Sequence, residues 1–474
     1  MPRLSSAVML VLVLAVVTPI GAQTPAPDPL VQAANTPPQF GAAVVIAPPG
    51  GLCRELVTQF ATAGGPRGDL RDRCRELVAD AKVPALTGPV QTGLEQMAGV
   101  QITGAGNARV GTAGFQLANI AGRLAALRGG ALGFSLLGLE PDKDEQLPGT
   151  MLASLGSAPL VAQAASAPSS GGSPGRLGAF INGSYSTGSL DATSREAGVD
   201  FDSGGVTAGV DYRLTPNLIL GAAFGYLHTS ADYQQSSGKL DSDDYSGTLY
   251  GTYYVTDQFY LDGTATVGGT NYSSDRRIKY ALPAVPATGG GITTVNQTAQ
   301  ADPGAIWYAF GLSGGYDFQF GGFTVGPIGR LTYVRTEVDS YQERIDNSAA
   351  GSGLALNVGS QTVESFTTSL GGQASYSWST PIGVIVPTVR FEWLHEFLND
   401  ARSIKANFVQ DPTPGTGTTI TWKTDQPDRD FFIVGAGLAA TFPRGFSAFV
   451  LYETVVDLRD VTEHHVVGGV RMTF

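Results

Sequence analysis

Residues 465–474, His-Val-Val-Gly-Gly-Val-Arg-Met-Thr-Phe, decide the fold of this chain. Successive side chains of a β-strand point to opposite faces, so a strand sorts these residues into two sets. The apolar set comprises Val466, Gly468, Val470, Met472 and Phe474. The mixed, more polar set comprises His465, Val467, Gly469, Arg471 and Thr473. A soluble sheet could contain such a strand too, so the rest of the chain has to decide what the apolar face meets.

The first 22 residues have the pattern of a secretory signal peptide. Arg3 supplies a positive charge, residues 7–17 are an uninterrupted apolar run, and residues 20–22 offer a small-residue cleavage site before Gln23. The run is too short to span a bilayer, which needs roughly 20 apolar residues. No later segment reaches such a length without polar interruption. The exported chain is therefore predicted to lack a transmembrane helix, which does not exclude a membrane-spanning sheet.

Composition favours a sheet that faces hydrocarbon. Charged residues make up only 15% of the chain, whereas soluble domains contain about 25%. Glycine (63 residues), tyrosine (17) and phenylalanine (22) are abundant. The net charge of −12 argues against a nucleic-acid partner, because binding to phosphates requires a basic face. The acidity is expected in solvated loops instead.

Alternating segments from about Arg176 onward predict twelve strands. In the eighth, Leu370 and Tyr376 share one face, and Ser369 and Gln373 share the other. The predicted strands begin near Arg176, Val199, Leu218, Asp241, Phe259, Ala305, Phe323, Ser365, Val384, Phe431, Phe446 and Val461.

The connections between these strands alternate in length. Short turns are predicted at 215–217, 256–258, 321–322, 381–383 and 443–445, and long polar loops at 273–302, 340–362 and 399–430. An even strand number with short turns at one end and long loops at the other is typical of bacterial transmembrane barrels. A closed barrel also satisfies every backbone donor and acceptor without water. The fold class predicted is all-β, a 12-stranded antiparallel transmembrane β-barrel in the outer membrane of a Gram-negative bacterium. A soluble sandwich or barrel, the alternative, predicts no such alternation.

Strand parity assigns directions to the charged and large aromatic side chains. The charges predicted to face the lumen, because they are costly on a lipid face, are Arg330, Arg390, Glu392, Glu453 and Arg471. The aromatic residues predicted to form interfacial girdles are Tyr245, Tyr253, Trp378, Trp393 and Tyr452.

The region before the barrel is predicted to be small and partly helical. Residues 23–50 are rich in proline and are expected to be unstructured. Residues 52–60 and 70–78 carry apolar stripes at helical spacing and predict a helical hairpin. Cys53 and Cys74 each begin the pentapeptide Cys-Arg-Glu-Leu-Val. Because the periplasm is oxidising, they are expected to form a disulfide.

A further helix is predicted at residues 115–128, ended by two glycines. It is slim, with Arg123 and Arg128 as its charged residues. Residues from about 153 to 175 are rich in alanine, serine, proline and glycine and predict a flexible tether.

The barrel region resembles the translocator domain of autotransporters, the type V secretion proteins. The similarity extends over residues 176–474 and is strongest in the combination of several motifs. These are Gly-Ala-Phe-Ile-Asn-Gly-Ser at 178–184, Thr-Ala-Gly-Val-Asp-Tyr-Arg at 207–213, Arg-Phe-Glu-Trp-Leu-His-Glu-Phe at 390–397, Asp-Gln-Pro-Asp-Arg-Asp-Phe-Phe at 425–432 and Gly-Gly-Val-Arg-Met-Thr-Phe at 468–474.

This resemblance implies a helix threading the barrel lumen and a passenger on the N-terminal side. It divides the chain into a signal peptide (1–22), a short passenger-like region (23–110), a pore helix with linker (111–175) and the barrel (176–474). Helix 115–128 is the natural pore helix, with Arg123 or Arg128 pairing with Glu392 or Glu453, and residues 132–139 are the alternative lumen plug.

The resemblance also implies a C-terminal signal and a set of partners. The residues expected to be read by the outer-membrane barrel assembly machinery are Val466, Val470, Met472 and Phe474. Outer-membrane lipid and the Sec export pathway are the other expected partners, and a monomer is expected. The chain departs from the family because no solenoid repeat precedes the barrel. It also has no adjacent pair of asparagines in helix 115–128, where self-cleavage would need one.

The function predicted is an outer-membrane autotransporter barrel that displays its own short N-terminal region. The alternative is a non-secretory barrel that acts as a channel or, through its long loops, as an adhesin. Catalysis is not expected: residues 311–315, Gly-Leu-Ser-Gly-Gly, match a nucleophile elbow but lie within a predicted strand. His395, near a rim, has no compelling serine partner, and the four histidines lack zinc-ligand spacing. No cofactor or metal is expected.

Overall fold

The computed structural model describes most of the chain outside the first 27 residues. The described residues are 28–47, 51–104, 113–121, 123–124, 134–136, 177–283, 292–415, 417–441 and 446–472. The predicted signal peptide, Arg128, the tether at 153–175 and Phe474 lie outside them, as does most of the alternative plug at 132–139.

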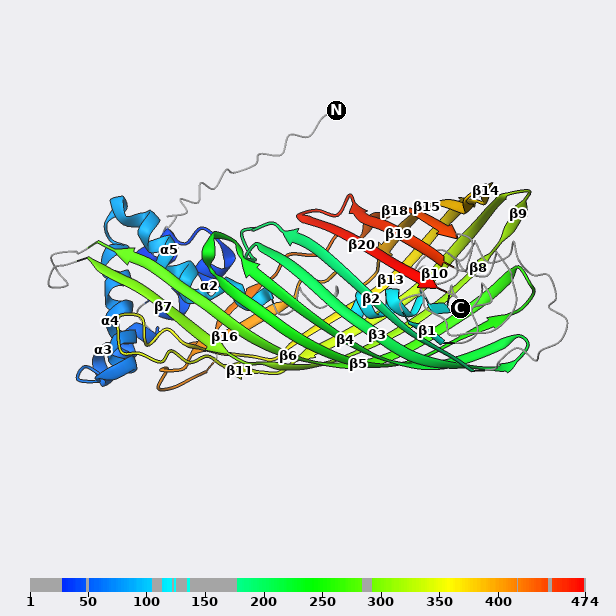
Figure 1. Cartoon of the computed structure of the whole chain (residues 1–474). Coiled ribbons are helices and arrows are strands. Elements are labelled where there is room, and N and C mark those ends of the chain that lie inside the picture. The colour runs from blue at the N-terminus through cyan, green and yellow to red at the C-terminus, as the bar shows by residue number, and fades with distance from the viewer. Residues whose placement is uncertain are drawn as a thin grey trace, which may run out of the picture.

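Twelve of the described strands form one closed antiparallel barrel (Figure 1). Each strand pairs with its neighbours along the chain, and β20 pairs with β2 to close the cylinder. The observed strands begin within four residues of the predicted positions, so the predicted fold class is confirmed. The barrel strands are β2 (Leu177–Leu190), β3 (Val199–Thr215), β4 (Leu218–Tyr233), β5 (Gly238–Tyr254), β6 (Phe259–Leu282), β8 (Gly304–Tyr316), β10 (Phe323–Val338), β13 (Gln361–Tyr376), β15 (Gly383–Glu396), β18 (Asp430–Thr441), β19 (Phe446–Val456) and β20 (Val461–Met472).

The two faces of the barrel wall differ in polarity, as the alternation predicts. In β13, Ser369 and Gln373 are buried in the lumen, whereas Leu370 on the other face is 51% exposed. Large apolar side chains exposed on the outside recur around the barrel: Val206, Val210, Leu220, Phe224, Leu249, Val267, Phe310, Leu312, Leu331, Val389, Phe391, Leu438 and Val450. An apolar outer wall around a polar interior is the arrangement of a transmembrane barrel.

The two ends of the barrel differ in their connections. The turn end carries the short connections, where β9 (Phe318–Phe320) and β14 (Trp378–Thr380) extend the wall and β1 (Phe134–Leu136) pairs in parallel with β2. The loop end carries the long ones, and these are more regular than the sequence predicts. β6 continues to Leu282 and pairs with β7 (Thr293–Ala301). A second sheet is formed by β11 (Tyr341–Gln342), β12 (Leu356–Val358), β16 (Ser403–Phe408) and β17 (Ile420–Lys423).

The prediction of long polar loops at 273–302, 340–362 and 399–430 is thus partly wrong, because each range contains strand residues. Polar residues at alternate positions obscure strands whose other side chains are buried, such as Ile278, Tyr280 and Leu282 in β6.

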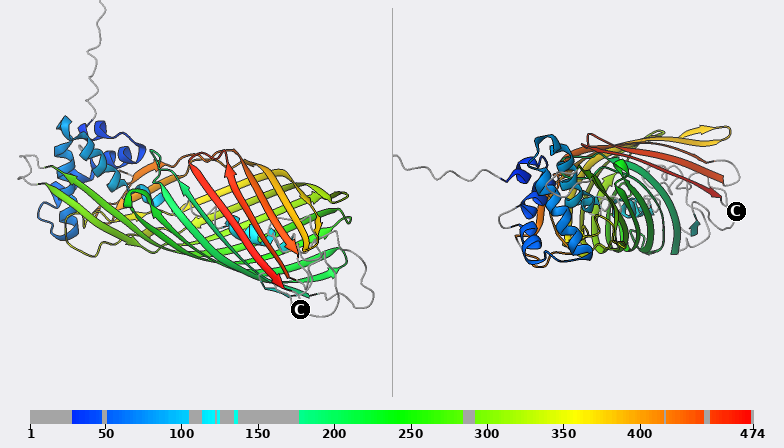
Figure 2. Two further views of the ribbon diagram at one scale, coloured as in Figure 1. Left: turned by 45° about the horizontal axis from the view of Figure 1, so that its top comes forward. Right: turned by 90° about the vertical axis from the view of Figure 1, so that its left-hand side faces the viewer.

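A small helical unit, residues 28–104, lies at the loop end (Figures 1 and 2). Cys53 of α3 and Cys74 of α4 are joined by the predicted disulfide. The unit contains α1 (Pro29–Ala33), α2 (Pro37–Ile46), α3 (Leu52–Gln59), α4 (Gly65–Asp80) and α5 (Thr87–Ala98), with the 3₁₀ helices η1 (Pro84–Leu86) and η2 (Val100–Thr103). Within the described ranges, no helix combines the length and apolarity needed to cross a bilayer.

The expectation that residues 23–50 are unstructured is wrong for α1 and α2. Asp28 and Thr36 cap these helices, because their side chains accept hydrogen bonds from the backbone N–H groups of Leu30 and Gln39. Proline at the first helical position fixes a φ value that suits a helix start. The same prolines therefore begin helices here and do not break them.

The helical unit and the loop end of the barrel share one apolar core. The helices contribute residues such as Leu30, Ile46, Leu56, Leu77, Leu94 and Met97, all at most 1% exposed. The barrel extensions contribute Ile278, Tyr280, Leu356, Ile404, Phe408 and Trp422, among others. Each fully buried side chain of this kind contributes about 1.5–3 kcal/mol. The unit therefore packs on the barrel as part of the same folded body.

Candidate functional site

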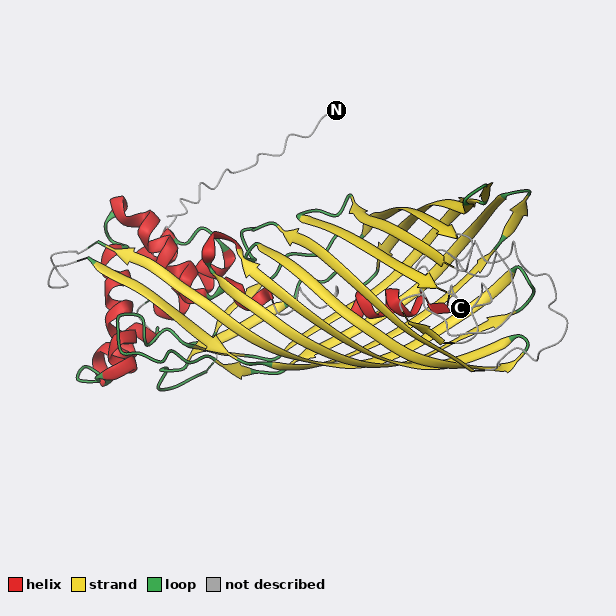
Figure 3. Cartoon of the chain, viewed as in Figure 1, coloured by secondary structure: helices red, strands yellow, loops and turns green. Residues whose placement is uncertain are grey.

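A helix lies inside the barrel, over residues 113–121 and 123–124 (Figure 3). We call it the luminal helix; it begins two residues before the helix predicted at 115–128 and overlaps it through Leu124. Its side chains are closely surrounded, with Ala113, Ile120 and Leu124 at most 2% exposed. The small and slim residues of this segment allow it to fit within the ring of strands.

One face of the luminal helix is hydrogen-bonded to the wall formed by β2, β3 and β5. The Gln116 side chain donates to the Thr248 hydroxyl at 3.3 Å and accepts from the Thr207 hydroxyl at 2.8 Å. The Asn119 side chain donates to the Thr207 hydroxyl at 3.0 Å and accepts from the Ser184 hydroxyl at 3.0 Å. Because residues three and four apart share a helix face, these contacts fix the rotation of the helix in the lumen.

Arg123 extends this face with a buried ion pair. Its Nε and Nη2 atoms donate to the two Asp211 carboxylate oxygens at 2.6 and 3.1 Å. The Tyr250 hydroxyl donates to the same carboxylate at 3.1 Å, and the Phe180 ring centroid lies 5.1 Å from the Arg123 guanidinium carbon. A bidentate guanidinium–carboxylate contact is among the strongest and most directional in proteins. The prediction that Arg123 pairs with Glu392 or Glu453 is therefore wrong in its partner, and Arg128 lies outside the described residues.

The two predicted glutamates belong to a separate luminal cluster. Glu392, 1% exposed at its side chain, pairs with Arg390 and lies 3.7 Å from Arg330, and it accepts a hydrogen bond from Ser369. The second carboxylate, Glu453, accepts from Arg390 Nη1 at 3.1 Å. The wall thus neutralises these charges within itself. The side chain of Arg471 is not among those described.

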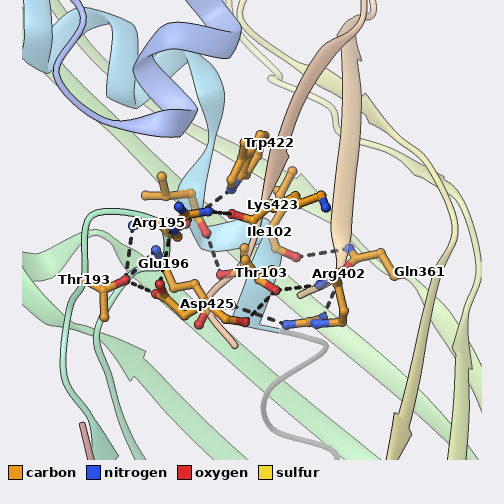
Figure 4. Close-up of polar contacts among 12 residues, drawn as sticks. Ile102, Thr103, Thr193, Arg195, Glu196, Gln361, Arg402, Trp422, Lys423 and Asp425 are labelled. Atoms are coloured by element: carbon orange, nitrogen blue, oxygen red, sulfur yellow. Dashed lines mark hydrogen bonds and ion pairs between the residues drawn. The ribbon is translucent and has the colours of Figure 1, made fainter. Parts of the chain in front are cut away.

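A polar collar surrounds the chain where it passes from the helical unit toward the lumen (Figure 4). The passing chain is Ile102 and Thr103, and the collar comprises Thr193, Arg195, Glu196, Gln361, Arg402, Trp422, Lys423 and Asp425. The Gln361 side chain donates to the Ile102 carbonyl at 3.2 Å and accepts from Arg402 Nη1 at 3.3 Å. Arg402 also lies 3.5 Å from a Glu196 carboxylate oxygen. These contacts connect the passing chain to β13 and to the β2–β3 connection.

The opposite part of the collar joins the β2–β3 connection to β17. Arg195 pairs with Asp425 at 3.6 Å and donates to the Lys423 carbonyl at 3.3 Å. The Trp422 indole donates to the Arg195 carbonyl at 3.3 Å, and Thr193 bonds Asp425. The collar was missed in the sequence because its members come from separate polar loops with no common spacing. A tryptophan within a polar loop was the available signal.

A buried arginine fastens the helical unit to the barrel. Arg276 of β6 forms a bidentate pair with Glu343, with Nε–Oε1 and Nη2–Oε2 distances of 2.7 and 2.5 Å. It also donates to the carbonyls of Gln96 in α5, at 2.9 Å, and of Leu354, at 3.0 Å. One side chain therefore joins a barrel strand, the helical unit and the long β10–β13 connection.

The aromatic side chains predicted to form interfacial girdles are exposed or half-buried on the barrel wall. Tyr245, Tyr253, Trp378 and Tyr452 are 40–57% exposed, as interfacial residues would be. Trp393 is half-buried and donates to the Asp430 carboxylate at 3.0 Å. His395 approaches the same carboxylate at 2.8 Å.

The serine of the Gly-Leu-Ser-Gly-Gly motif at 311–315 forms a hydrogen bond within the barrel wall. Ser313 lies within β8, and its hydroxyl donates to Asp262 of the neighbouring strand at 3.4 Å. A nucleophile elbow requires a strand-to-helix turn, which this position lacks. In the part of the chain that the structure describes, no group of three or more histidine, cysteine, aspartate or glutamate side chains could hold a metal ion.

Comparison with known proteins identifies the barrel. The family model described as autotransporter beta-domain matches residues 179–453, more than half of the chain. Outer membrane protein B of Rickettsia japonica is 26% identical over 150 residues, which are 31% of this chain and 9% of that protein. The chain thus matches about a tenth of the length of this curated relative.

Solved structures of translocator domains are also similar to this chain. The translocator domain of autotransporter NalP from Neisseria meningitidis has a TM-score of 0.46 and 16% identity, covering 64% of this chain and 88% of that one. The beta domain of the Bordetella autotransporter BrkA has a TM-score of 0.38 and 18% identity, covering 62% and 98%. The chain belongs to the autotransporter beta-domain family and is a protein of the Gram-negative outer membrane.

Proposed function

We propose that this barrel translocates its own N-terminal region and displays the helical unit at the cell surface. The observation that carries the proposal is the course of the chain. The helical unit lies at the loop end, the collar surrounds residues 102–103, the luminal helix follows, and β1 pairs with the start of β2 at the turn end. In bacterial barrels the long loops are external and the short turns periplasmic, so this course leads from the outside to the periplasm.

The luminal contacts support retention of the chain after its passage. Gln116, Asn119 and Arg123 are each buried and bonded to the wall. Unbonded polar groups in such a place would be costly, so these pairs stabilise the helix in one position. An occupied lumen argues against a solute channel as the primary role.

We propose partners that fit the surfaces and the sequence of the protein. The apolar outer wall fits outer-membrane lipid, and the signal pattern of residues 1–22 fits the Sec export pathway. We further propose that the outer-membrane assembly machinery binds the C-terminal strand through Val466, Val470, Met472 and Phe474. Val466 fits this role because its side chain is 48% exposed on β20.

The test is the accessibility of an epitope tag placed directly before Asp28. Externally added protease is expected to remove this tag from intact cells while a periplasmic marker protein stays whole. The matched control carries the same tag in the turn at Gly321 and Gly322, at the turn end, where it is expected to be protected. A tag before Asp28 that stays protected until the cells are broken would refute surface display.

A further inference from the structure

The helical unit lacks a core that is independent of the barrel. Its apolar side chains pack against a docking face, which we define as Ile278, Tyr280, Leu282, Val295, Ala299, Leu354, Leu356, Val358, Ile404, Ala406, Phe408, Ile420 and Trp422. All of these lie on β6, β7, β12, β16, β17 and their connections. Of the helices α1 to α5 only α4 is longer than 12 residues, and isolated helices below about 12–15 residues are marginal in water. Removal of the docking face would therefore expose apolar side chains of the unit that are buried in the shared core.

Helix α2 shows this dependence most directly. Its sequence, Pro-Pro-Gln-Phe-Gly-Ala-Ala-Val-Val-Ile, contains no charged residue. Residues 41–43, 45 and 46 are buried, whereas Phe40 and Val44 are about half exposed, so an apolar helix of this kind depends on the cover that its buried face receives. A Cβ atom on Gly41 would lie 2.9 Å from the Thr421 carbonyl oxygen and 3.3 Å from an Ile420 methyl group. The helix backbone thus lies directly on β17, with no room for a side chain between them.

Polar groups at the edge of the docking face match the helices as well. The Asp69 carboxylate of α4 accepts from the backbone N–H groups of Gly351 and Gly353 at 3.0–3.1 Å. The Thr293 hydroxyl of β7 donates to Glu76 at 2.8 Å. With Arg276 bound to α5, both α4 and α5 are held by specific bonds from the barrel as well as by apolar contact.

We propose that the docking face is a binding site for the exported chain itself, on which residues 28–104 fold after they reach the loop end. This inference rests on the surface display proposed above. Before the helices meet the docking face they remain unfolded, and an unfolded chain is the form that can pass a lumen lined by strands. Folding at the loop end then holds the region outside. The docking face thus serves as a folding template that belongs to the barrel.

The first test changes the exported side of the interface only, in the full chain with the tag before Asp28. Gly41→Leu places a side chain against β17, whereas Gly88→Leu places the same side chain in α5 where no atom lies within 4 Å. Leucine favours helix over glycine in both variants. Gly41→Leu is expected to lower the surface-exposed fraction of the tag several-fold, or to abolish the protease-resistant helical fragment. Gly88→Leu is expected to behave as the wild type.

The second test changes the barrel side. Phe408→Ala with Ile420→Ala removes two large side chains of the docking face, and Lys405→Ala with Thr421→Ala changes exposed positions on the same two strands. Heat-dependent migration in gel electrophoresis verifies that each barrel is folded. The first pair is expected to reproduce the Gly41→Leu defect, and the second pair is expected to have no effect.

The outcomes separate this inference from the proposed display. The template would be overturned if Gly41→Leu showed wild-type export and a wild-type protease-resistant fragment. The same result in the Phe408→Ala and Ile420→Ala variant, with its barrel folded, would also overturn it. Normal export with an unfolded, protease-sensitive unit would support it. A wild-type tag that is never accessible on intact cells refutes display and leaves the docking contacts to be explained by a periplasmic unit.

Discussion

Arg123 on the luminal helix and Asp211 on β3 form a bidentate ion pair in which both side chains are almost completely buried, at 3% and 1% exposure. The two residues are separated by 88 positions in the sequence, so their pairing connects the segment before the barrel to the barrel wall. Tyr250 supplies a further hydrogen bond to the carboxylate. This ion pair fixes the luminal helix more firmly than any other described contact between that helix and the barrel wall, because it joins opposite charges away from solvent.

The first prediction concerns this pair. Asp211→Asn leaves the Arg123 guanidinium buried without a counter-ion, which costs about 3–5 kcal/mol for pairs of this kind. We expect the folded barrel to lose its compact form in heated gel electrophoresis at a lower temperature. The double variant Arg123→Leu with Asp211→Leu is expected to recover much of the loss, since it removes both charges. Equal heat stability of Asp211→Asn and the wild type would contradict the assignment.

The second prediction concerns the anchor of the helical unit. Glu343→Gln removes the charge that pairs with Arg276 and is expected to weaken the docking of α5 and the β10–β13 connection, also by about 3–5 kcal/mol. External protease should then cut the helical unit in intact cells, while heat-dependent migration of the barrel changes little. Glu337→Gln, on a half-exposed pair with Arg335, is the control and is expected to change neither readout. A unit as resistant as the wild type in Glu343→Gln would be inconsistent with the anchor.

The third prediction concerns the disulfide. Cys53→Ser with Cys74→Ser removes a link between residues separated by 21 positions, and closing a loop of this length contributes about 3 kcal/mol. The helical unit is expected to become sensitive to protease at a lower temperature, and a reducing agent should reproduce the effect on the wild type. The reducing agent should leave the double variant unchanged. A change in the double variant would mean that the agent acts elsewhere.

The fourth prediction concerns pH. Burial raises the pKa of Asp80, at the end of α4, above its ordinary value. A carboxyl whose pKa is higher in the folded state stabilises that state below the unfolded pKa, and the stabilisation is lost as the pH rises through the folded pKa. The helical unit should therefore resist thermal proteolysis better at a pH below the pKa of Asp80 in the folded protein than at pH 7. Asp80→Asn is expected to be more stable than the wild type at pH 7 and to show a smaller pH dependence. A less stable Asp80→Asn at pH 7 would show that the carboxylate has a favourable partner.

The fifth prediction concerns the last residue of the sequence. If the assembly machinery binds the C-terminal strand as proposed, deletion of Phe474 impairs insertion into the outer membrane more than export across the inner membrane. The measurement is the ratio of membrane-inserted, heat-modifiable protein to processed protein in the periplasm. Deletion of an exposed loop residue such as Gly417 is the control. Normal insertion without Phe474 would refute the proposed C-terminal assembly signal but would not contradict the barrel fold.

Much of the fold was predictable because a strand displays its period within a few consecutive residues. The alternation of Leu370 and Tyr376 with Ser369 and Gln373 was enough to assign the two faces of β13, and similar stretches located all twelve barrel strands. The disulfide between Cys53 and Cys74 followed from composition and compartment. The luminal helix was visible as a slim helical segment with a glycine stop.

The errors arose where local pattern and tertiary environment disagree. Proline-rich residues 29–46 were expected to be unstructured, but their capping residues and the docking face make them helical. Helix α5 was missed, although Val90, Leu94 and Met97 are buried at helical spacing. The polar loops contain strands because every second side chain meets the helical unit, and that contact cannot be seen in the loops alone.

The sequence by itself determined the strands, their two faces and the disulfide, because each depends on residues close in the chain or on the compartment. Only the tertiary structure decided that Arg123 pairs with Asp211, that Arg276 joins α5 to Glu343, and that the helices share their core with the barrel. These relationships depend on the register of the closed barrel and on the rotation of one helix inside it. Both are set by the sum of many contacts between distant segments, and no short stretch of sequence contains that sum.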